Sequence, residues 1–351
     1  MKKFHFILLL LGSGFLALLV CKIGVRELWR ELMLFGWGLV PFFLFEFVAE
    51  AIHTIAWSHC LSGPLRRLSG MRLFQIRMAG YAINYLTPTA ALGGEVTKAA
   101  FLSSCCGGPE AVSGVLAGKL CLGIGQLLFV AFGSVVLIGN ATLPHPVWAV
   151  MILSGGIVAA GMLAFLLLQK HGKLGALVRW LAAQKFSGRK LQGAARQINE
   201  VDEALKILHH ERPQALALAV SWHMFAHATG ILQTWCFFTL LHQPVSIVTA
   251  MAVWVLGMWF DLLAFAVPLN LGTLEGSRIV AFKAIGSDAV TGMAFGTAQR
   301  LAQLGCACLG LATYAWLTSR AGRLAVTLQL PIPAEITESQ AGIGATSWRT
   351  K

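Results

Sequence analysis

The sequence has little charge and few acidic residues. Asp and Glu together number 15 in 351 residues, and charged side chains make up 12% of the chain, whereas soluble domains carry about 25%. Hydrophobic residues reach 57%, and the mean hydropathy is +0.71. This composition excludes a water-soluble enzyme built around one apolar core, and it also excludes a disordered chain.

Several motifs of catalysis and metal binding are also missing. The 8 cysteines include no C-x-x-C pair, which excludes a zinc ribbon and a thioredoxin motif. The sequence contains no H-E-x-x-H, G-x-S-x-G or Walker A motif, and no G-x-G-x-x-G between a strand and a helix. Glu46, Glu50 and His53 share one helix face, and His223 and His227 are four residues apart, but their spacing matches no known metal site. We therefore predict no metal, no cofactor and no catalytic residue.

Long apolar runs are abundant and predict a chain that crosses a membrane several times. Six segments read as full crossings: 4–20, 32–59, 111–139, 146–169, 214–241 and 289–318. Two further apolar segments, 78–104 and 245–287, are interrupted by Pro and Gly. Loop charge has to decide whether these two segments cross the membrane.

Basic residues gather in a few loops. Residues 60–77 carry four Arg and no acid, 170–213 carry nine Lys or Arg against four acids, and 140–145 and 242–244 carry no Lys, Arg, Asp or Glu. Basic loops stay on the cytoplasmic side, so both termini are predicted to be cytoplasmic. This rule accounts for the net charge of +12, and nucleic-acid binding is not expected.

The loop charges fit only if both interrupted segments dip into the membrane and return. The predicted fold class is an all-α polytopic membrane protein with about six transmembrane helices and two re-entrant, Pro/Gly-broken hairpins. These hairpins would enter from opposite faces and form an inverted repeat of about 32–139 and 214–318. The alternative for 245–267 is a full crossing, because it is apolar enough to cross alone.

The whole of residues 1–330 is predicted to be one membrane domain. Within it, 170–213 is predicted to be a cytoplasmic amphipathic linker along the headgroups. The tail 331–351 is polar and is predicted to be disordered.

The two hairpins carry matching polar residues. In each, a Pro precedes a Glu by seven residues. Irregular backbone at membrane depth is tolerated only where protein or a water-filled cavity covers it, and a Glu suits the positive end of a helix dipole. The predicted headgroup-binding residues are Asn84, Thr87, Pro88, Gly93, Gly94 and Glu95 in the first hairpin, and Pro268, Asn270, Gly272 and Glu275 in the second. Alternatively, these residues only cap and satisfy the broken helices.

Asp261, Lys98, Arg278 and Arg300 complete the predicted site. Each lies in an apolar segment, where a charge costs about 2.5–3.5 kcal/mol or more. Lys98 follows Glu95 by three residues, and Arg278 follows Glu275 by three, which places each pair on one helix face. Two interpretations stand side by side: neutralisation within the helix, or attraction of an anionic phosphate by the three cations.

The stretch from Arg77 to Pro88, followed by Gly-Gly-Glu-Val-Thr-Lys at 93–98, resembles the membrane region of lysylphosphatidylglycerol synthases, a flippase-like family. Pro268 to Glu275 is similar to that family's later P-x-x-x-G-x-x-E element, and Ala56-Trp57 to its A-W pair. The resemblance covers about residues 4–320. The family usually has Arg where Lys98 stands, a change that keeps the charge and loses the planar fork.

The resemblance implies a bacterial cytoplasmic (inner) membrane protein that moves lipid. Lysyl-lipid synthases carry a soluble transferase domain after the membrane part, and only a short tail follows here, so we expect the lipid-moving part without the synthase. Stand-alone members of the family include a hopanoid-biosynthesis-associated protein. The expected partner is therefore a membrane lipid: a phospholipid, hopanoid, isoprenoid or glycolipid. The sequence makes no prediction about oligomeric state.

Transport of a lipid headgroup between leaflets is the leading functional hypothesis. One alternative is a membrane-embedded lipid-modifying enzyme that uses Glu95, Glu275 or Asp261 as acid or base. Another is a non-catalytic partner of a lipid-biosynthesis system, which would act through the linker 170–213. Transport is favoured because of the two matched hairpins, which a scaffold does not need.

Overall fold

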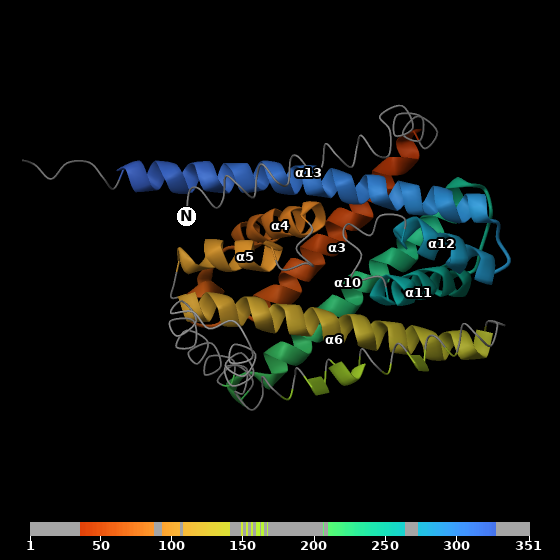
Figure 1. The fold of residues 1–351 in the computed structure, drawn as a ribbon, viewed down its shortest axis with the longest axis horizontal. Helices are drawn as coiled ribbons and strands as arrows, with labels where there is room; N and C mark the ends of the chain where they lie inside the picture. Colours follow the sequence, from red (N-terminus) through yellow and green to blue (C-terminus); the bar gives the residue numbers. More distant parts are fainter. Residues whose placement is uncertain are drawn as a thin grey trace, which may run out of the picture. The chain divides into compact units, whose positions relative to one another are not determined.

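The computed structural model describes residues 36–87, 93–105, 108–140, 210–263 and 273–327, together with single helical positions between 149 and 206. Within these ranges all regular secondary structure is helical, as predicted. After a 3-10 turn at Gly36–Gly38, the first group of helices is α3 (Leu39–His59), α4 (Gly70–Leu86), α5 (Gly93–Ser103) and α6 (Gly108–Asn140), with a second 3-10 turn at Gly63–Arg67 between α3 and α4. The second group is α10 (Pro213–Leu240), α11 (Ile247–Leu263), α12 (Thr273–Ala284) and α13 (Ala289–Thr327) (Figure 1).

Four of the described helices are long and apolar enough to cross a membrane. They are Gly36–His59, Gly108–Leu137, Pro213–Leu240 and Ala289–Ser319. At about 1.5 Å per residue, the 21 residues of α3 alone reach the roughly 30 Å of a hydrocarbon core. These helices match four of the six predicted crossings. The predicted span 4–20 and the tail 331–351 lie outside the described residues, and only scattered helical positions are described in the predicted span 146–169 and the linker 170–213.

The two interrupted segments each form a pair of shorter helices. α4 and α11 have 17 residues each, whereas α5 has 11 and α12 has 12. α4 ends at Leu86, and Thr87 is already extended, with φ −116° and ψ 140°. The next residue is Pro88, and a proline disfavours the helical conformation of the residue before it. The first break therefore falls where the proline predicts it.

The predicted basic loop 60–77 is wrong in its second half. α4 begins at Gly70, and the side chain of Ser69 caps it by accepting a hydrogen bond from the backbone N–H of Arg72 at 3.3 Å. Arg77 is buried in the bundle, where its Nε donates to Glu50 Oε2 at 2.7 Å. Counting charges along the sequence cannot separate a solvated arginine from one that a carboxylate binds inside the protein.

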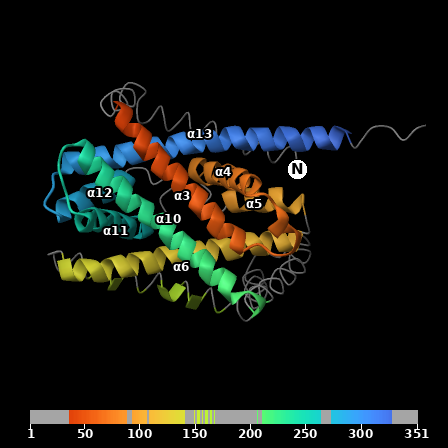
Figure 2. The same ribbon diagram turned by 180° about the vertical axis from the view of Figure 1, so that it is seen from behind.

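α3 and α10 form the most extensive contact between described helices. They run antiparallel: Gly38 lies near Leu240, the rings of Phe42 and Phe237 are 5.8 Å apart, and the Arg212 guanidinium donates to the Leu61 carbonyl at 2.6 Å. The α4–α5 pair lies toward one end of this antiparallel pair, and the α11–α12 pair toward the other (Figures 1 and 2). The two pairs of short helices therefore begin at opposite ends of the bundle.

The distribution of side chains suits an apolar solvent. Large apolar side chains face outward: Trp37 is 90% exposed, Phe132 62% and Phe225 59%. Charged side chains such as Arg278 and Arg300 are buried. A water-soluble protein shows the opposite arrangement, so the helices are those of an integral membrane protein.

The chain divides into two compact units, Met1–Tyr314 and Ala315–Lys351. The interactions that form the site described below lie within the first unit. In the described part of the second unit, the hydroxyls of Thr318 and Ser319 donate to carbonyls three residues back along the end of α13.

Candidate functional site

The first hairpin holds its Glu in a network of cations and amides. Glu95 is bound by Lys98 Nζ at 2.5 Å and approached by Lys119 Nζ of α6 at 3.6 Å. Asn84 Nδ2 donates to the same carboxylate at 3.4 Å. The predicted pairing of Glu95 with Lys98 within one helix is confirmed. The carboxylate also lies in the first turn of α5, where the helix dipole favours it.

Gly80 of α4 and Gly94 of α5 allow a close approach of the two helices. The backbone N–H of Gly94 donates to Asn84 Oδ1 at 2.7 Å, and a Cβ on Gly94 would lie 2.1 Å from the carbonyl oxygen of Gly80. The stem of Lys98 also passes over Gly80, and its Nζ lies 5.3 Å from the centroid of the Trp57 ring. α4 and α5 can therefore touch along this line only if both glycines lack side chains.

In the second hairpin the expected pair within α12 does not form. Glu275 is bound by both Nε and Nη2 of Arg300 from α13, with Nη2 at 2.8 Å from Oε2. Arg278 instead donates to Asp261 Oδ2 on α11 at 2.8 Å and to Gln299 Oε1 at 2.8 Å. The reason is steric: the guanidinium of Arg278 lies over Gly257, where a Cβ would be 2.1 Å from Nη1. Because Gly257 has no side chain, Arg278 can lie against α11, where it reaches Asp261 instead of Glu275.

Equivalent helices of the two groups carry these residues at equal positions. The Glu is the third residue of its short helix, the following cation the sixth, the facing glycine the eleventh residue of the preceding helix, and the second cation the twelfth residue of the following long helix. In the first group these are Glu95, Lys98, Gly80 and Lys119. In the second group they are Glu275, Arg278, Gly257 and Arg300.

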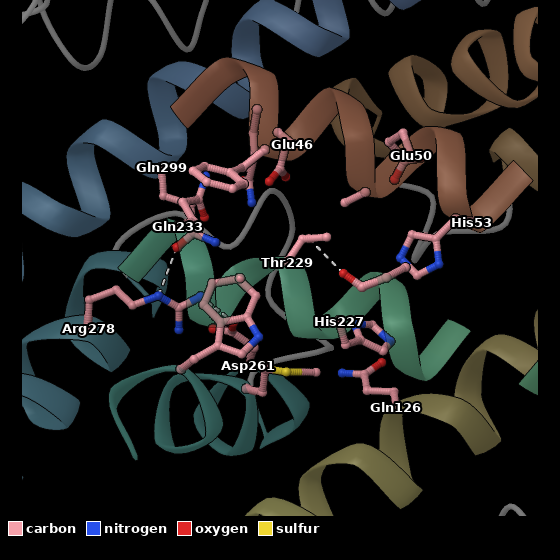
Figure 3. A pocket seen from close by; sticks show the side chains of 17 residues that line it. Glu46, Glu50, His53, Gln126, His227, Thr229, Gln233, Asp261, Arg278 and Gln299 are labelled. Atoms are coloured by element: carbon pink, nitrogen blue, oxygen red, sulfur yellow. Dashed lines mark hydrogen bonds and ion pairs between the residues drawn. The ribbon is translucent and has the colours of Figure 1, made fainter. Parts of the chain in front are cut away.

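A polar cavity of about 190 Å³ lies where α3, α6, α10, α11, α12 and α13 converge (Figure 3). Its polar lining is Glu46, Glu50, His53, Gln126, His227, Thr229, Gln233, Asp261, Arg278, Gln299 and Gln303. Glu46 and Glu50 are the eighth and twelfth of the 21 residues of α3, so the cavity lies near the middle of that helix. Convergent polar groups fix the orientation of a ligand and give a site its specificity.

The predicted site is thus divided between three places. Asp261 and Arg278 line the cavity. Asn84, Thr87, Gly93, Gly94, Glu95 and Lys98 belong to the first hairpin, and Glu275 and Arg300 form a pair between α12 and α13. Pro88, Pro268, Asn270 and Gly272 lie outside the described residues.

Sequence reasoning missed the amides of the cavity. Gln126, Gln233, Gln299 and Gln303 lie in long helices apolar enough to cross a membrane. A neutral amide costs less in hydrocarbon than a charge, so we did not single these residues out. Glutamine in a membrane span was the signal that would have found them.

Three imidazoles meet beside the cavity. His53 Nδ1 and His223 Nδ1 are 2.8 Å apart, so one ring donates to the other, and the centroids of His53 and His227 are 5.1 Å apart. His53 and His227 are each the fifteenth residue of their helix. Among the described residues, no group of three or more His, Cys, Asp or Glu side chains is arranged to hold a metal ion.

Comparison with known proteins identifies the family. The family described as lysylphosphatidylglycerol synthase TM region matches residues 6–310. No curated protein and no solved structure gives a significant match. Since the matched region contains both hairpins and the cavity and covers most of the chain, the protein belongs to the lysylphosphatidylglycerol synthase TM region family.

Proposed function

We propose that this protein moves a lipid, or a lipid-linked headgroup, between the two leaflets of a membrane. Membership of the family points to a role connected with membrane lipids. The observation that carries the proposal is the polar cavity in the middle of the antiparallel α3–α10 pair. A polar headgroup is expensive to move through hydrocarbon, and a polar chamber midway lowers that cost.

The proposed architecture is an inverted repeat of about 32–139 and 214–318, with α4–α5 and α11–α12 as its re-entrant hairpins. Three observations support it: the equal lengths of α4 and α11, the equal positions of the charged residues, and the antiparallel course of α3 and α10. We place the basic loops and both termini in the cytoplasm, and the protein in a bacterial cytoplasmic membrane.

The charged pairs of the hairpins have a positioning role in this proposal. Lys98 and Arg300 are each bound by a carboxylate, so neither offers an uncompensated charge to a phosphate. The pairs fix the beginning of α5 and of α12, which border the breaks in the two hairpins. The headgroup passes through the cavity while its acyl chains stay in the surrounding lipid.

A cavity-filling variant tests transport. Ala49 lines the cavity, and Val48 beside it is 45% exposed on the outer side of α3. In vesicles with fluorescent lipids in both leaflets, a quencher added outside reports lipids that cross. We expect Ala49→Phe to slow crossing at least about tenfold and Val48→Phe to leave it unchanged. Equal rates of lipid crossing for the two variants would show that lipid does not pass through the cavity.

The hairpin carboxylates are tested by the double substitution Glu95→Gln and Glu275→Gln. We expect it to abolish crossing, because each hairpin loses the anion that holds a buried cation. Glu110→Gln is the control, since Glu110 is exposed on α6. Normal transport by a correctly folded double variant would contradict the assignment of the hairpins to the site.

A lipid-modifying enzyme is the second candidate, because three carboxylates and two histidines line the cavity. Such groups serve as general acids and bases. This candidate predicts covalent turnover of a lipid by the purified protein. Mass spectrometry that finds every membrane lipid unchanged after incubation would count against it.

A further inference from the structure

We infer that the cavity binds an uncharged group rich in hydroxyls, as in the headgroup of a glycosyl or polyol lipid. The inference rests on the proposed function, because it names the class of headgroup that the same cavity receives. The charges of the lining and its hydrogen-bonding atoms both point to this class.

The charges of the cavity exclude an anionic group. Three carboxylates line it, those of Glu46, Glu50 and Asp261, against one guanidinium, that of Arg278. Arg278 is already bound to Asp261 at 2.8 Å, and Glu50 is bound by Arg77 at 2.7 Å. A phosphate would find no uncompensated cation in the described lining and would meet Glu46, the one lining carboxylate without an ion pair among the described residues. Like charges brought together in this way cost several kcal/mol.

The donors of the cavity disfavour a cationic group. The indole N–H of Trp254 lines the cavity and is buried, with no hydrogen-bond partner among the described residues, and so is Nε2 of His227. The amides of Gln126 and Gln303 add further N–H donors. An ammonium group carries only donors, so it can bind the carboxylate and amide oxygens of the lining but accepts no hydrogen bond from its N–H groups.

Hydroxyl groups can bind both the hydrogen-bond donors and the acceptors of the lining. A hydroxyl donates one hydrogen bond and accepts two, and an amide side chain presents an acceptor beside its donors. The cavity is lined by four glutamines, Thr229 and Trp254, drawn from several helices, so several hydroxyls on one small ring or chain are satisfied together. Its volume of about 190 Å³ is below the 300–1,000 Å³ usual for larger ligands, which suits a small headgroup without its acyl chains.

The test compares three lipids that carry the same fluorescent acyl chain. Their headgroups are glucosyl, phosphoglycerol and a primary ammonium, which are neutral, anionic and cationic. In vesicles containing the full-length protein, we expect the glucosyl lipid to cross at least about tenfold faster than the other two. In nanodiscs, we expect the glucosyl lipid to raise the melting temperature of the protein above its value with either charged lipid. We also expect free glucose to have a smaller effect than the glucosyl lipid.

Single substitutions in the cavity sharpen the comparison. Trp254→Phe removes the indole N–H, and Gln126→Leu removes one amide at similar size. Each is expected to slow the glucosyl lipid about three- to tenfold, the loss of one hydrogen bond. Trp235→Phe and Gln243→Leu are the matched controls, because both side chains are exposed outside the cavity.

The outcomes separate this inference from the proposed function. Equal crossing of all three lipids, or faster crossing of a charged one, overturns the inference and leaves transport standing. If no lipid crosses, transport fails and the nanodisc melting temperatures decide: a rise specific to the glucosyl lipid supports the site, and equal temperatures overturn it. A rise with free glucose as large as with the lipid assigns the cavity to a soluble sugar and overturns the lipid headgroup.

Discussion

At the scale of single residues, the structure gives each buried cation a carboxylate. Arg77 binds Glu50, Arg278 binds Asp261 and Arg300 binds Glu275, each across two helices, whereas Lys98 binds Glu95 within α5. The cost of an unpaired charge in hydrocarbon predicts that such partners exist. It does not predict which partner, because that depends on the surface over which a long side chain can lie. Arg278 binds Asp261 because its guanidinium can lie over Gly257, which has no side chain.

Removing one member of a buried pair should cost more than removing both. Asp261→Asn leaves the guanidinium of Arg278, which is 1% exposed, without its counter-charge, and we expect a loss of about 3–5 kcal/mol in the free energy of unfolding. The double variant Asp261→Asn, Arg278→Met should lose less than Asp261→Asn alone. Denaturant unfolding in detergent, followed by tryptophan fluorescence, measures both. A double variant that loses as much stability as Asp261→Asn alone, or more, would show that the pair is not coupled.

The candidate site was only partly predictable at this scale. Asp261 and Arg278 stood out because ionisable residues are rare in apolar spans, and both line the cavity. Glu46 and Glu50 also stood out as ionisable residues in an apolar span, but they were not assigned to the headgroup site. The glutamines did not, and only the crossing of helices distant in sequence brings Gln126 together with Gln299.

At the scale of helices, the break after α4 was predictable and the beginning of that helix was not. Pro88 predicts the end of α4, and the structure ends that helix at Leu86. The beginning of α4 at Gly70 was missed, because Arg72 and Arg77 gave the segment the composition of a basic loop. The capping hydroxyl of Ser69 was the local signal for that beginning.

Alanine substitutions at two glycines should have opposite effects. Gly94→Ala places a Cβ 2.1 Å from the Gly80 carbonyl and forces α5 away from α4, so we expect a loss of about 1–3 kcal/mol or more in the free energy of unfolding. At Gly276 an added Cβ meets no atom of the described chain within 4 Å. Gly276→Ala should therefore stabilise α12 by about 0.5–1 kcal/mol. Thermal unfolding measures whether each variant is less or more stable than the native protein. Equal changes in stability would refute the close approach of α4 and α5.

The beginning of α13 should depend on pH through Asp288. Its carboxylate accepts hydrogen bonds from the backbone N–H of Thr291 at 2.7 Å and from the Thr291 hydroxyl at 2.6 Å. These bonds hold the pKa of Asp288 below its ordinary value of 3.8. A lowered pKa means that the stabilisation is present above the unfolded-state pKa and is lost as the pH falls through the folded-state value.

Asp288→Ala should therefore lower the melting temperature at neutral pH. The difference from the native protein should shrink as the pH falls below about 3.8. Melting curves over a pH series measure this difference. A difference that stays constant into the acid range would show that the charge of Asp288 does not stabilise the helix.

At the scale of the whole molecule, the order of long, short, short and long helices occurs twice. The helical class and four of the six crossings were predictable from apolar runs and loop charge. The position of the cavity was not, since it depends on how the two groups of helices meet. That meeting is a tertiary contact between α3 and α10, which hydropathy along a single chain does not encode.

Labelling from one side of the membrane tests the proposed topology. Ser69 and Ser246 are exposed and occupy the same place, immediately before α4 and α11. With the 8 native cysteines replaced, we expect Ser246→Cys to react with an impermeant maleimide in intact cells and Ser69→Cys to react only after permeabilisation. Reaction of both from the same side would refute the inverted repeat.

The contact of His53 with His227 has a mechanical consequence. The two residues stand at the same position of two helices that run in opposite directions, so a tilt of one helix against the other would pivot near their contact. If one helix tilts against the other about a fulcrum, its two ends swing to opposite sides and the middle hardly moves. Such a tilt would widen the gap between the helices at one leaflet and narrow the gap at the other leaflet, while the bound headgroup stays in place.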